Sequence, residues 1–425
     1  MTVYTPYWWE EAPRPELPGQ AVTDMSDVVV VGAGYTGLSA ALELVRAGRS
    51  VQVFDKERAG EGASSRSGGI GSGNLRISFT KMIQTLGLER AKAMYGEGLA
   101  AREDLTRFIQ DGRIDCHFDS VGRFTGATRP EHYEGLARNS ELLHKHLGID
   151  TYAVPKSEQR SEIGSDFYHG GVIRNDIGGL HPALLHQGML ERALEAGVTV
   201  HARTAVLDIS GEAGNFTVST ARGTVKTRDV IVCTNGYTDA SAPWLRRRVV
   251  PVPSLILATD PLPADLMKQL VPKNRMLGDT NHLHHYFRPS PDGTRILFGG
   301  RTTGTLQVDG PVNHRPLRRK MISIFPELES VGFSHMWWGY VAMNLDHLPQ
   351  MVVKDGIYYP TGFCGSGVVW ARWFGRKAAL KILGDPAGDS AFERQSFRPI
   401  PFYNGNPWFV PGAVFWYKMR DALNI

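Results

Sequence analysis

Three glycines near the start of the chain have the spacing of a phosphate-binding turn. Gly32, Gly34 and Gly37 form a GxGxxG pattern directly after the apolar run 27–31. Bare backbone at such a turn approaches a pyrophosphate, and the helix that follows offers free N–H groups and a positive dipole end. Asp55 ends the next predicted strand, where a carboxylate accepts hydrogen bonds from adenosine ribose hydroxyls. The pattern predicts dinucleotide binding; the alternative is a plain tight turn with a surface acid.

Two further Gly-rich segments favour FAD over NAD. Residues 64–73, SSRSGGIGSG, are small enough to leave room for a ribityl chain and a flavin ring. Residues 361–367, TGFCGSG, open a predicted helix and direct N–H groups toward a flavin carbonyl, where they stabilise the anionic reduced flavin. A nicotinamide enzyme does not need this far turn. An ordinary helix-capping turn is the alternative for the last segment.

The densest group of titratable residues is a histidine cluster beside Tyr286. In one predicted strand, His282, His284 and Tyr286 share a face and His285 lies on the other. No carboxylate or cysteine nearby completes a ligand set, so no metal site is predicted. An active-site role for at least one histidine and a purely structural role both stay open.

The elements that must position these residues alternate between strands and helices. Residues 26–57 have the size of a βαβ unit. After a middle region, 180–196 has helical spacing, and 198–210, 216–227 and 229–237 are predicted as three successive strands. Near the end, a strand and a Gly-rich turn precede a helix from about residue 368 to residue 383. This pattern predicts an α/β fold with a Rossmann-like cofactor domain.

The predicted domains are discontinuous. The FAD-binding domain, of the glutathione-reductase type, comprises 26–84, 176–245 and 346–385. The segments 85–175 and 246–345 form an α+β substrate domain on a mainly antiparallel sheet. Residues 1–25 and 386–425 are terminal extensions that we expect to pack on the body; a partner or membrane contact is the alternative for the apolar C-terminal tail.

Composition excludes several classes of protein. The net charge of the 425-residue chain is only +4, far from the basic excess of a nucleic-acid-coating protein. Cys116, Cys233 and Cys364 are too few and too scattered for a disulfide framework or a zinc site, which favours a reducing compartment. No signal peptide is evident, and no apolar run reaches the roughly 20 residues of a membrane helix. We expect a soluble, cytoplasmic protein.

Several motifs in order resemble one known family. DVVVVGAGYTGLSAALEL, GEGASSRSGG, TNGYT, YFRPSPDGTRILFGG and TGFCGSGV are similar to segments of the D-amino-acid oxidase superfamily of FAD-dependent oxidoreductases. The resemblance covers nearly the whole chain and is greatest to the gamma-glutamylputrescine oxidase branch. It implies contacts to FAD from the following residues: Gly32, Gly34, Tyr35, Thr36, Gly37, Asp55, Lys56, Ser64, Ser65, Arg66, Ser67, Gly69, Val206, Thr234, Asn235, Gly236, Phe363, Gly365, Ser366, Gly367 and Val368.

The chain departs from the family pattern at two places. The C-terminal turn, usually GHG, contains Ser366 between its glycines, and Val341 stands where amino-acid oxidases carry an arginine for the substrate carboxylate. A simple α-amino acid is therefore disfavoured as substrate, because a buried carboxylate needs a cationic partner. Residues 336–349 lack the cysteine that tethers flavin in some relatives, so FAD is expected to bind noncovalently.

The resemblance implies oxidation of a C–N bond in a small amine or N-substituted amino acid. A hydride passes to flavin N5, and the imine product hydrolyses to an aldehyde and an amine. Dioxygen or an electron carrier is the acceptor, and the oligomeric state stays open. The alternatives are a tRNA wobble-base modifying enzyme and a flavin-binding protein without turnover. Candidate pocket residues are His282, His284, Tyr286, Trp338 and Arg76, with Arg301 as a second anion-binding candidate and Trp337, Tyr340 and Phe287 as further aromatic walls.

Overall fold

Five parallel strands form the centre of the first sheet in the computed structural model, which describes residues 1–301, 310–393 and 397–423. Val28 to Val31 and the whole of the next strand are buried, as expected for parallel strands covered on both faces. The undescribed residues 302–309 belong to the predicted substrate domain, and 394–396 and 424–425 to the C-terminal extension. The central order is β18 (Ile357–Thr361), β11 (Gly223–Val232), β1 (Met25–Val31), β2 (Val51–Phe54) and β8 (Thr199–His201).

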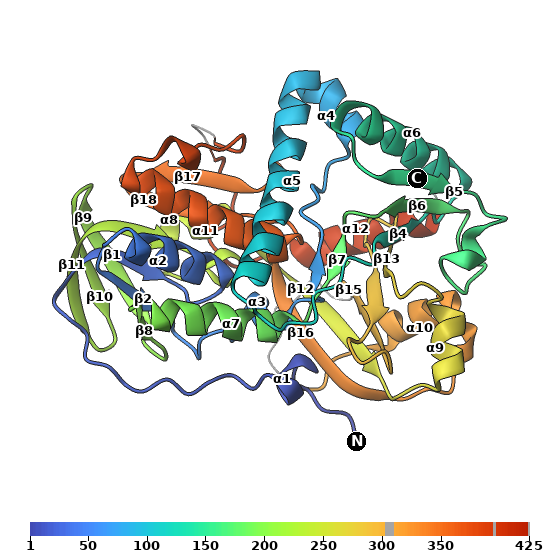
Figure 1. The fold of residues 1–425 in the computed structure, drawn as a ribbon, viewed down its shortest axis with the longest axis horizontal. Helices are drawn as coiled ribbons and strands as arrows, with labels where there is room; N and C mark the ends of the chain where they lie inside the picture. The colour runs from blue at the N-terminus through green and yellow to red at the C-terminus, as the bar shows by residue number, and fades with distance from the viewer. Residues whose placement is uncertain (302–309, 394–396, 424–425) are drawn as a thin grey trace.

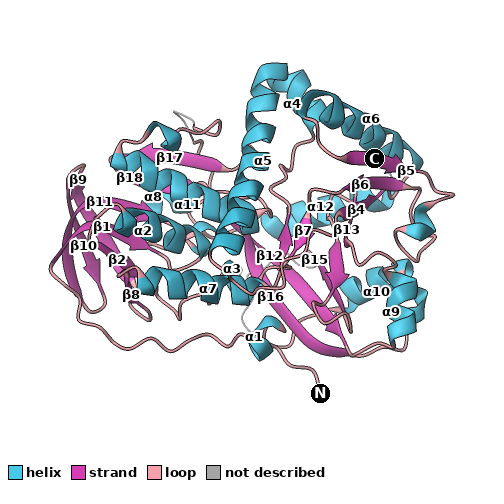
Figure 2. Ribbon diagram, in the orientation of Figure 1, coloured by secondary structure: helices cyan, strands magenta, loops and turns pink. Residues whose placement is uncertain are grey.

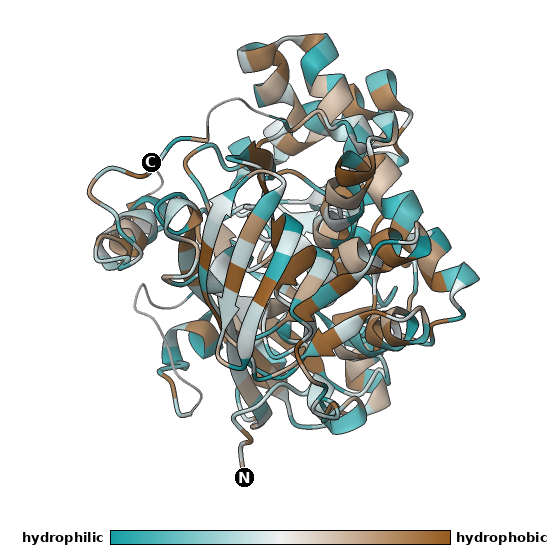
Figure 3. Cartoon of the chain, turned by 90° about the vertical axis from the view of Figure 1, so that its left-hand side faces the viewer, coloured by the Kyte–Doolittle hydropathy of each residue, from teal (hydrophilic) through white to brown (hydrophobic). Residues whose placement is uncertain are grey.

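Helices cover one face of this sheet and a β-meander covers the other (Figures 1 and 2). The helices are α2 (Tyr35–Arg46), α7 (Pro182–Glu195) and α11 (Gly367–Leu383), and α2 contacts both others. The meander consists of β9 (Val206–Glu212), β10 (Asn215–Thr220) and the first half of β11; its Phe216 and Val218 pack with Val29 and Val31. Seen from this side, apolar and polar residues alternate along the strands (Figure 3).

The second sheet is antiparallel except for one pair, as predicted. Only β13 and β4 run parallel among its described neighbours. Its order is β16 (Phe333–Met343), β12 (Val250–Thr259), β15 (Ile296–Gly300), β14 (Tyr286–Pro289), β13 (Met276–Asp279), β4 (Arg123–Gly126), β6 (Gly171–Arg174) and β5 (Thr151–Val154). The α/β class with a second, mainly antiparallel α+β unit is confirmed.

The remaining helices surround the second sheet and the boundary between the two sheets, except the short helix at 243–246, which packs with the first sheet. The long helix α5 stands between them in Figure 1. The bounds are α3 (Ala63–Arg66), α4 (Phe79–Leu86), α5 (Leu88–Asp111), α6 (Pro130–Leu147), α8 (Pro243–Arg246), α9 (Ala264–Leu270) and α10 (Arg315–Ile324), with the short strand pair β3 (Ile70–Gly71) and β7 (Gly178–Gly179).

The three strands predicted between residues 198 and 237 were wrong in number and bounds. There are four, because β8 ends at His201 and Arg203 takes a left-handed conformation, φ 52°, before β9 begins. Strand β11 begins at Gly223, after a turn at 221–222, and not at Asp229 as predicted. The strand changes partner midway: its first half pairs with β10 and its second half with β1. Pairing with β10 ends at Thr227, just before the predicted strand break, whereas pairing with β1 begins at Lys226 and continues to Val232.

Both terminal segments contact the body. The N-terminal segment forms α1 (Trp8–Glu11), and the Val3 N–H donates to the carbonyl of Ser334, 2.8 Å. In the C-terminal segment, which ends in α12 (Val410–Leu423), the Tyr403 hydroxyl donates to the carbonyl of Val249, 3.0 Å. Among the described helices, none combines the length and apolar composition needed to span a bilayer.

Candidate cofactor and substrate site

A cavity of about 1040 Å³ runs from the carboxyl ends of β1, β2 and β11 to the second sheet. Eighteen of the residues predicted for FAD line it: Gly32, Gly34, Tyr35, Thr36, Asp55, Lys56, Ser64, Arg66, Ser67, Gly69, Val206, Thr234, Asn235, Phe363, Gly365, Ser366, Gly367 and Val368. So do His282, His284, Tyr286, Trp338 and Arg76. The cavity thus gathers segments that lie more than 300 positions apart in the sequence.

The first glycine turn leaves room for a phosphate at the start of α2. Gly32 has φ 105°, and a side chain at Gly37 would collide with the Gly32 carbonyl oxygen. Gly37 is therefore absent from the cavity wall; it packs α2 onto the turn. The N-cap residue Gly34 has no side chain, and Ser64 Oγ accepts the Tyr35 N–H at 3.0 Å. The positive end of the helix dipole is still directed at an anion placed in the turn. The turn fits a pyrophosphate.

Asp55 is fixed by backbone donors at the end of β2. Its carboxylate accepts the N–H groups of Ala33, 2.8 Å, and Glu57, 3.0 Å. Burial raises the pKa of Asp55 to about 6, against the lowering effect of these two bonds. The group lies on the cavity wall beside Lys56, which forms an ion pair with Asp239 at 3.1 Å. A ribose hydroxyl is the donor that suits the remaining carboxylate lone pairs.

Three tryptophans that the sequence did not mark as cofactor residues hold the loop 65–67. The indole N–H groups of Trp8, Trp9 and Trp337 donate to the carbonyl of Ser67, the Oγ of Ser65 and the carbonyl of Arg66, at 2.8, 2.8 and 2.9 Å. Ser65 is consequently turned away from the cavity wall. The WW pair at the N-terminus was visible in the sequence, but only the fold brings it to this loop.

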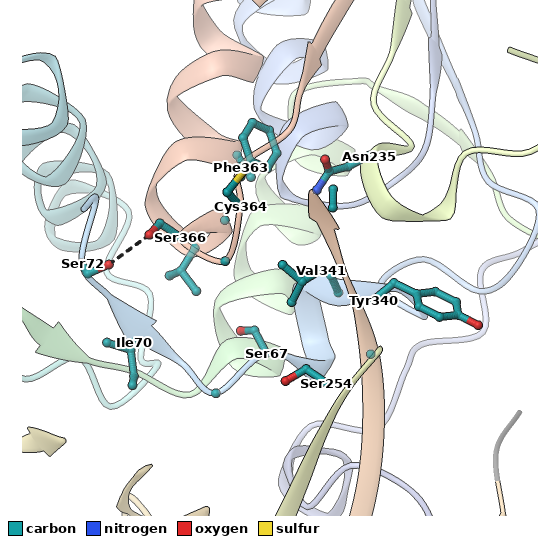
Figure 4. Close-up of a pocket in the computed structure, with 18 of the residues that line it drawn as sticks. Ser67, Ile70, Ser72, Asn235, Ser254, Tyr340, Val341, Phe363, Cys364 and Ser366 are labelled. Atoms are coloured by element: carbon teal, nitrogen blue, oxygen red, sulfur yellow. Dashed lines mark hydrogen bonds between the residues drawn. The ribbon is translucent and has the colours of Figure 1, made fainter. Parts of the chain in front are cut away.

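The Gly-rich turn at 361–367 is hydrogen-bonded to two other segments of the cofactor site (Figure 4). Asn235 Oδ1 accepts the Gly362 N–H at 2.9 Å, which ties the predicted TNG segment to the start of the turn. Gly236 lies in a short helical turn against Tyr340, off the cavity wall. Ser72 and Ser366 form a 3.5 Å hydrogen bond across the cavity rim. The turn leads into α11, which has no side-chain cap and so directs open N–H groups at the cavity.

The predicted histidine strand was wrong. Strand β14 begins only at Tyr286, and His282 to His285 form a turn before it, because their side chains bond to local and C-terminal acceptors. His282 Nδ1 lies 2.8 Å from Asp421 of α12, and His285 Nδ1 lies 2.8 Å from the Asp279 carboxylate. His285 is off the cavity wall, stacked on Phe298.

His284 faces the cavity as a neutral imidazole. Burial, together with the positive charge of Arg123, lowers the pKa of His284 to about 3. Its Nδ1 lies 3.2 Å from the carbonyl oxygen of Asp279, which can only accept, so the proton is assigned to Nδ1 and Nε2 keeps a lone pair. The ring stacks on Tyr286 at 6.1 Å, and the Tyr286 hydroxyl is 3.0 Å from Ser254 Oγ.

Two arginines bring positive charge to the cavity without a carboxylate partner among the described residues. Arg76 donates to the carbonyl of His282, 3.3 Å, and Arg301 contacts Met343 Sδ at 3.7 Å. Burial, then the neighbouring charge of Arg76, lowers the pKa of Arg301 to about 10. A third guanidinium, Arg123, also lines the cavity and was missed by sequence reasoning.

The aromatic residues divide between wall and core. Trp338, Tyr340 and Tyr286 line the cavity, whereas Trp337 and Phe287 are 1 % and 0 % exposed and pack in the core. Val341 also lines the cavity, so this position presents an apolar surface. Within the described chain, no three histidine, cysteine or acidic side chains gather into a group that could hold a metal ion.

These features fit FAD as the resident cofactor. A phosphate turn, a carboxylate at the ribose position and two helix N-termini line one elongated cavity. A side chain at Gly34 would crowd Ser64 Oγ, and one at Gly69 would collide with the Leu180 carbonyl, so the cradle requires bare backbone at both positions.

Comparisons with known proteins agree with this geometry. Residues 27–380 match the family DAO, described as FAD dependent oxidoreductase. The chain is 30% identical to gamma-glutamylputrescine oxidoreductase of Escherichia coli (strain K12) over 100% of both chains. It is 30% identical to a probable oxidoreductase, OrdL, of Haemophilus influenzae (strain ATCC 51907 / DSM 11121 / KW20 / Rd), over 89% of this chain and 88% of that protein.

Solved structures share the fold. The crystal structure of glycine oxidase from Geobacillus kaustophilus superposes with a TM-score of 0.75 at 20% identity, covering 89% of this chain and 99% of that one. The family match spans most of the chain, and the predicted cofactor and enzyme class are thereby confirmed. This chain belongs to the DAO family of FAD-dependent oxidoreductases.

Proposed function

We propose that the protein oxidises the C–N bond of a small amine that also carries an anionic group. The observation that supports this most is the pair Arg76 and Arg301, two cations at one cavity with no acidic partner in the described chain. Burial disfavours the unpaired charge of Arg301, while Arg76 is exposed at the mouth of the same cavity. A carboxylate or phosphonate on the substrate supplies the counter-charge for this pair. Relatives named gamma-glutamylputrescine oxidoreductase and glycine oxidase support the amine part.

FAD, when bound, supplies the hydride acceptor, and the imine product hydrolyses in water. The residues assigned to hold it are those of the phosphate turn, Asp55, the loop 64–69 and the turn 361–368. Cys233 and Cys364 lie on the cavity wall, but both are buried, and burial raises the pKa of the Cys364 thiol to about 11, which disfavours the thiolate that a covalent link requires. Noncovalent binding is therefore part of the proposal.

The cavity favours a neutral amine. A hydride leaves carbon readily only when the adjacent nitrogen carries a free electron pair. The charges of Arg76, Arg123 and Arg301 disfavour an ammonium group nearby, as does desolvation at the cavity wall that includes Trp338 and Tyr340. His284 Nε2 is too weakly basic to take a proton from an ammonium at neutral pH, so it accepts a hydrogen bond from the neutral amine and orients it.

An anaerobic titration tests the proposal. The measured quantity is the loss of the oxidised flavin band at about 450 nm. Each anionic substrate is compared with the matching amine that lacks the anionic group; the panel contains gamma-glutamyl-amines, N-methylated amino acids and aminophosphonates. We expect the anionic members to reduce the flavin at concentrations about 10- to 100-fold lower.

Arg301→Gln should remove most of that preference while the neutral amines keep their response. Equal reduction by neutral and anionic members would contradict the anionic substrate, and no bleaching by any amine would contradict C–N oxidation. Readmitting air then distinguishes dioxygen from a carrier as acceptor. Release of the yellow cofactor on acid precipitation tests noncovalent attachment.

The domain division at 26–84, 176–245 and 346–385 and the reducing, cytoplasmic setting stay parts of this proposal. The two sheets support the division, since β1, β2, β8, β11 and β18 fall in the first set of segments. The three free, buried cysteines support a reducing compartment.

A further inference from the structure

The last helix, α12, uses only one of its faces to contact the body. Val410 and Val414 pack against Val250 and Val252, and Tyr417 stacks on His282 at 5.7 Å. Asp421, one turn further, accepts the backbone N–H groups of His282 and Leu283. Positions three or four apart lie on the same side of a helix, so these four residues define the inner face.

The opposite face of α12 is also apolar, and it is exposed. Phe415, Met419 and Leu423 are spaced four apart and share this face with Trp416. Phe415, Trp416 and Leu423 are 69 %, 51 % and 59 % exposed. Such a face normally carries polar residues in a helix at a water-exposed surface.

Two aromatic residues extend this outer face along the preceding turn. Phe402 and Trp408 are 94 % and 64 % exposed, and the Trp408 indole donates to the Phe402 carbonyl at 3.3 Å. Together, Phe402, Trp408, Phe415, Trp416, Met419 and Leu423 form what we call the tail patch.

Basic residues border the tail patch. Arg246 packs against Gly405, and the Ile400 N–H donates to the carbonyl of the exposed Arg247 at 2.9 Å. Lys418 and Arg420 lie on either side of the outer face of α12. Between residues 397 and 423 the sequence contains one acid, Asp421, and it is held at the inner face. The surface is therefore both apolar and basic.

We propose that the tail patch lies on an anionic lipid surface. Aromatic side chains enter the headgroup region while flanking Lys and Arg side chains meet acidic headgroups, which is the pattern of helices that lie in the plane of a membrane. A second copy of the chain is disfavoured as occupant, because a two-fold interface would set these cations against their own copies.

Flotation of the 425-residue flavoprotein with lipid vesicles tests this proposal. We expect it to float with vesicles that mix phosphatidylcholine with phosphatidylglycerol and to stay behind with phosphatidylcholine alone. Raising the salt from about 0.1 M to about 1 M should weaken binding, since the screening length falls from about 10 to about 3 Å.

Variants assign the contact to this surface. The double variant Phe415→Ser, Trp416→Ser should weaken vesicle binding roughly tenfold or more by removing apolar insertion. Arg246→Gln with Arg247→Gln should remove most of the preference for phosphatidylglycerol. The controls are Leu207→Ser on β9 and Arg107→Gln on α5, an exposed apolar and an exposed basic residue elsewhere. The flavin band and the melting temperature show that each variant is folded.

Absence of flotation with anionic vesicles would overturn the proposal, as would an equal loss in the controls. Sedimentation velocity provides the second criterion. A wild-type dimer that Phe415→Ser, Trp416→Ser converts to a monomer would assign the tail patch to a protein interface and overturn the lipid surface.

Discussion

Gly37 shows how one missing side chain positions the phosphate turn. Its Cα faces the Gly32 carbonyl oxygen so closely that a methyl group has no space. We expect Gly37→Ala to push α2 off the turn and to abolish FAD retention, seen as purified protein without a flavin band. Gly135→Ala is the matched control, because a side chain at that position of α6 meets nothing within 4 Å. Loss of FAD in both variants, or in neither, would contradict the role of Gly37.

The pKa of Asp55 gives FAD binding a pH dependence. In the folded chain without FAD, burial raises the pKa of Asp55 to about 6. In an unfolded chain the pKa of an aspartate is about 3.9, so the folded chain holds this proton more tightly. The contribution of Asp55 to the stability of the cofactor-free fold is therefore present below about pH 4 and lost as the pH rises through about 6. The carboxylate that accepts ribose hydroxyls exists only above that range.

We therefore expect the Kd for FAD to rise as the pH falls through about 6. Asp55→Asn should weaken FAD binding by about 10- to 100-fold at pH 8, since a charged acceptor is lost. The variant should also have a flat profile in this window. Fluorescence recovery during FAD titration of the apoprotein measures both. A wild-type profile that is flat between pH 5 and pH 7 would show that ionised Asp55 is not the acceptor.

At the scale of elements, α1 holds the loop 65–67 through two indole hydrogen bonds. Trp8→Phe with Trp9→Phe leaves the Ser67 carbonyl and Ser65 Oγ without their indole donors. An unmade bond of this kind costs about 1–3 kcal/mol when the acceptor is buried. We expect a lower melting temperature and faster release of FAD on dilution. Trp408→Phe also removes one indole bond, but at an exposed carbonyl, and should change neither quantity.

Element patterns explain what the sequence could predict and what it could not. The strand, glycine turn and helix at 26–46 have local causes, a β-branched run, the GxGxxG spacing and 3.6-residue periodicity, so the prediction agrees with β1 and α2. The bounds of β11 depend on which neighbour each half pairs with, and that is decided by distant strands. The segment 282–285 was predicted as a strand because Asp421, which accepts the N–H groups of His282 and Leu283, lies at the far end of the chain.

The candidate site divides in the same way. The glycine turns and Asp55 depend on backbone geometry within a few residues, so their spacing in the sequence is enough to predict them. The tryptophan donors to the loop 65–67 depend on contacts between segments up to hundreds of positions apart. So do the surroundings of Arg301, which has no acidic partner among the residues that the structure describes. A single sequence carries the residues but not their pairing, because pairing follows from the tertiary fold.

At the scale of the whole molecule, the charge of the cavity is assembled from separate parts. Arg76 follows the Gly-rich segment 64–73, Arg123 lies on β4, and Arg301 follows β15. A positive charge lowers the pKa of a base nearby, and the pKa of His284 is lowered first by burial and then by the charges of Arg123 and Arg76. A substrate ammonium placed beside His284 meets the same field and loses its proton more readily than in water.

This field predicts the pH profile of flavin reduction. At saturating amine, the limiting anaerobic rate reports the pKa of the bound substrate, which we expect well below the value of about 10.4 for a free alkylamine. Arg123→Gln should raise that apparent pKa by roughly one unit, because one buried positive charge is removed. Arg123 is chosen over Arg301 since it is not assigned to the anionic group. Arg107→Gln, exposed on α5, is the control. If Arg123→Gln slows reduction equally at every pH, the arginine acts through structure alone; if the profile moves to higher pH, the cavity's charge sets the protonation state of the substrate.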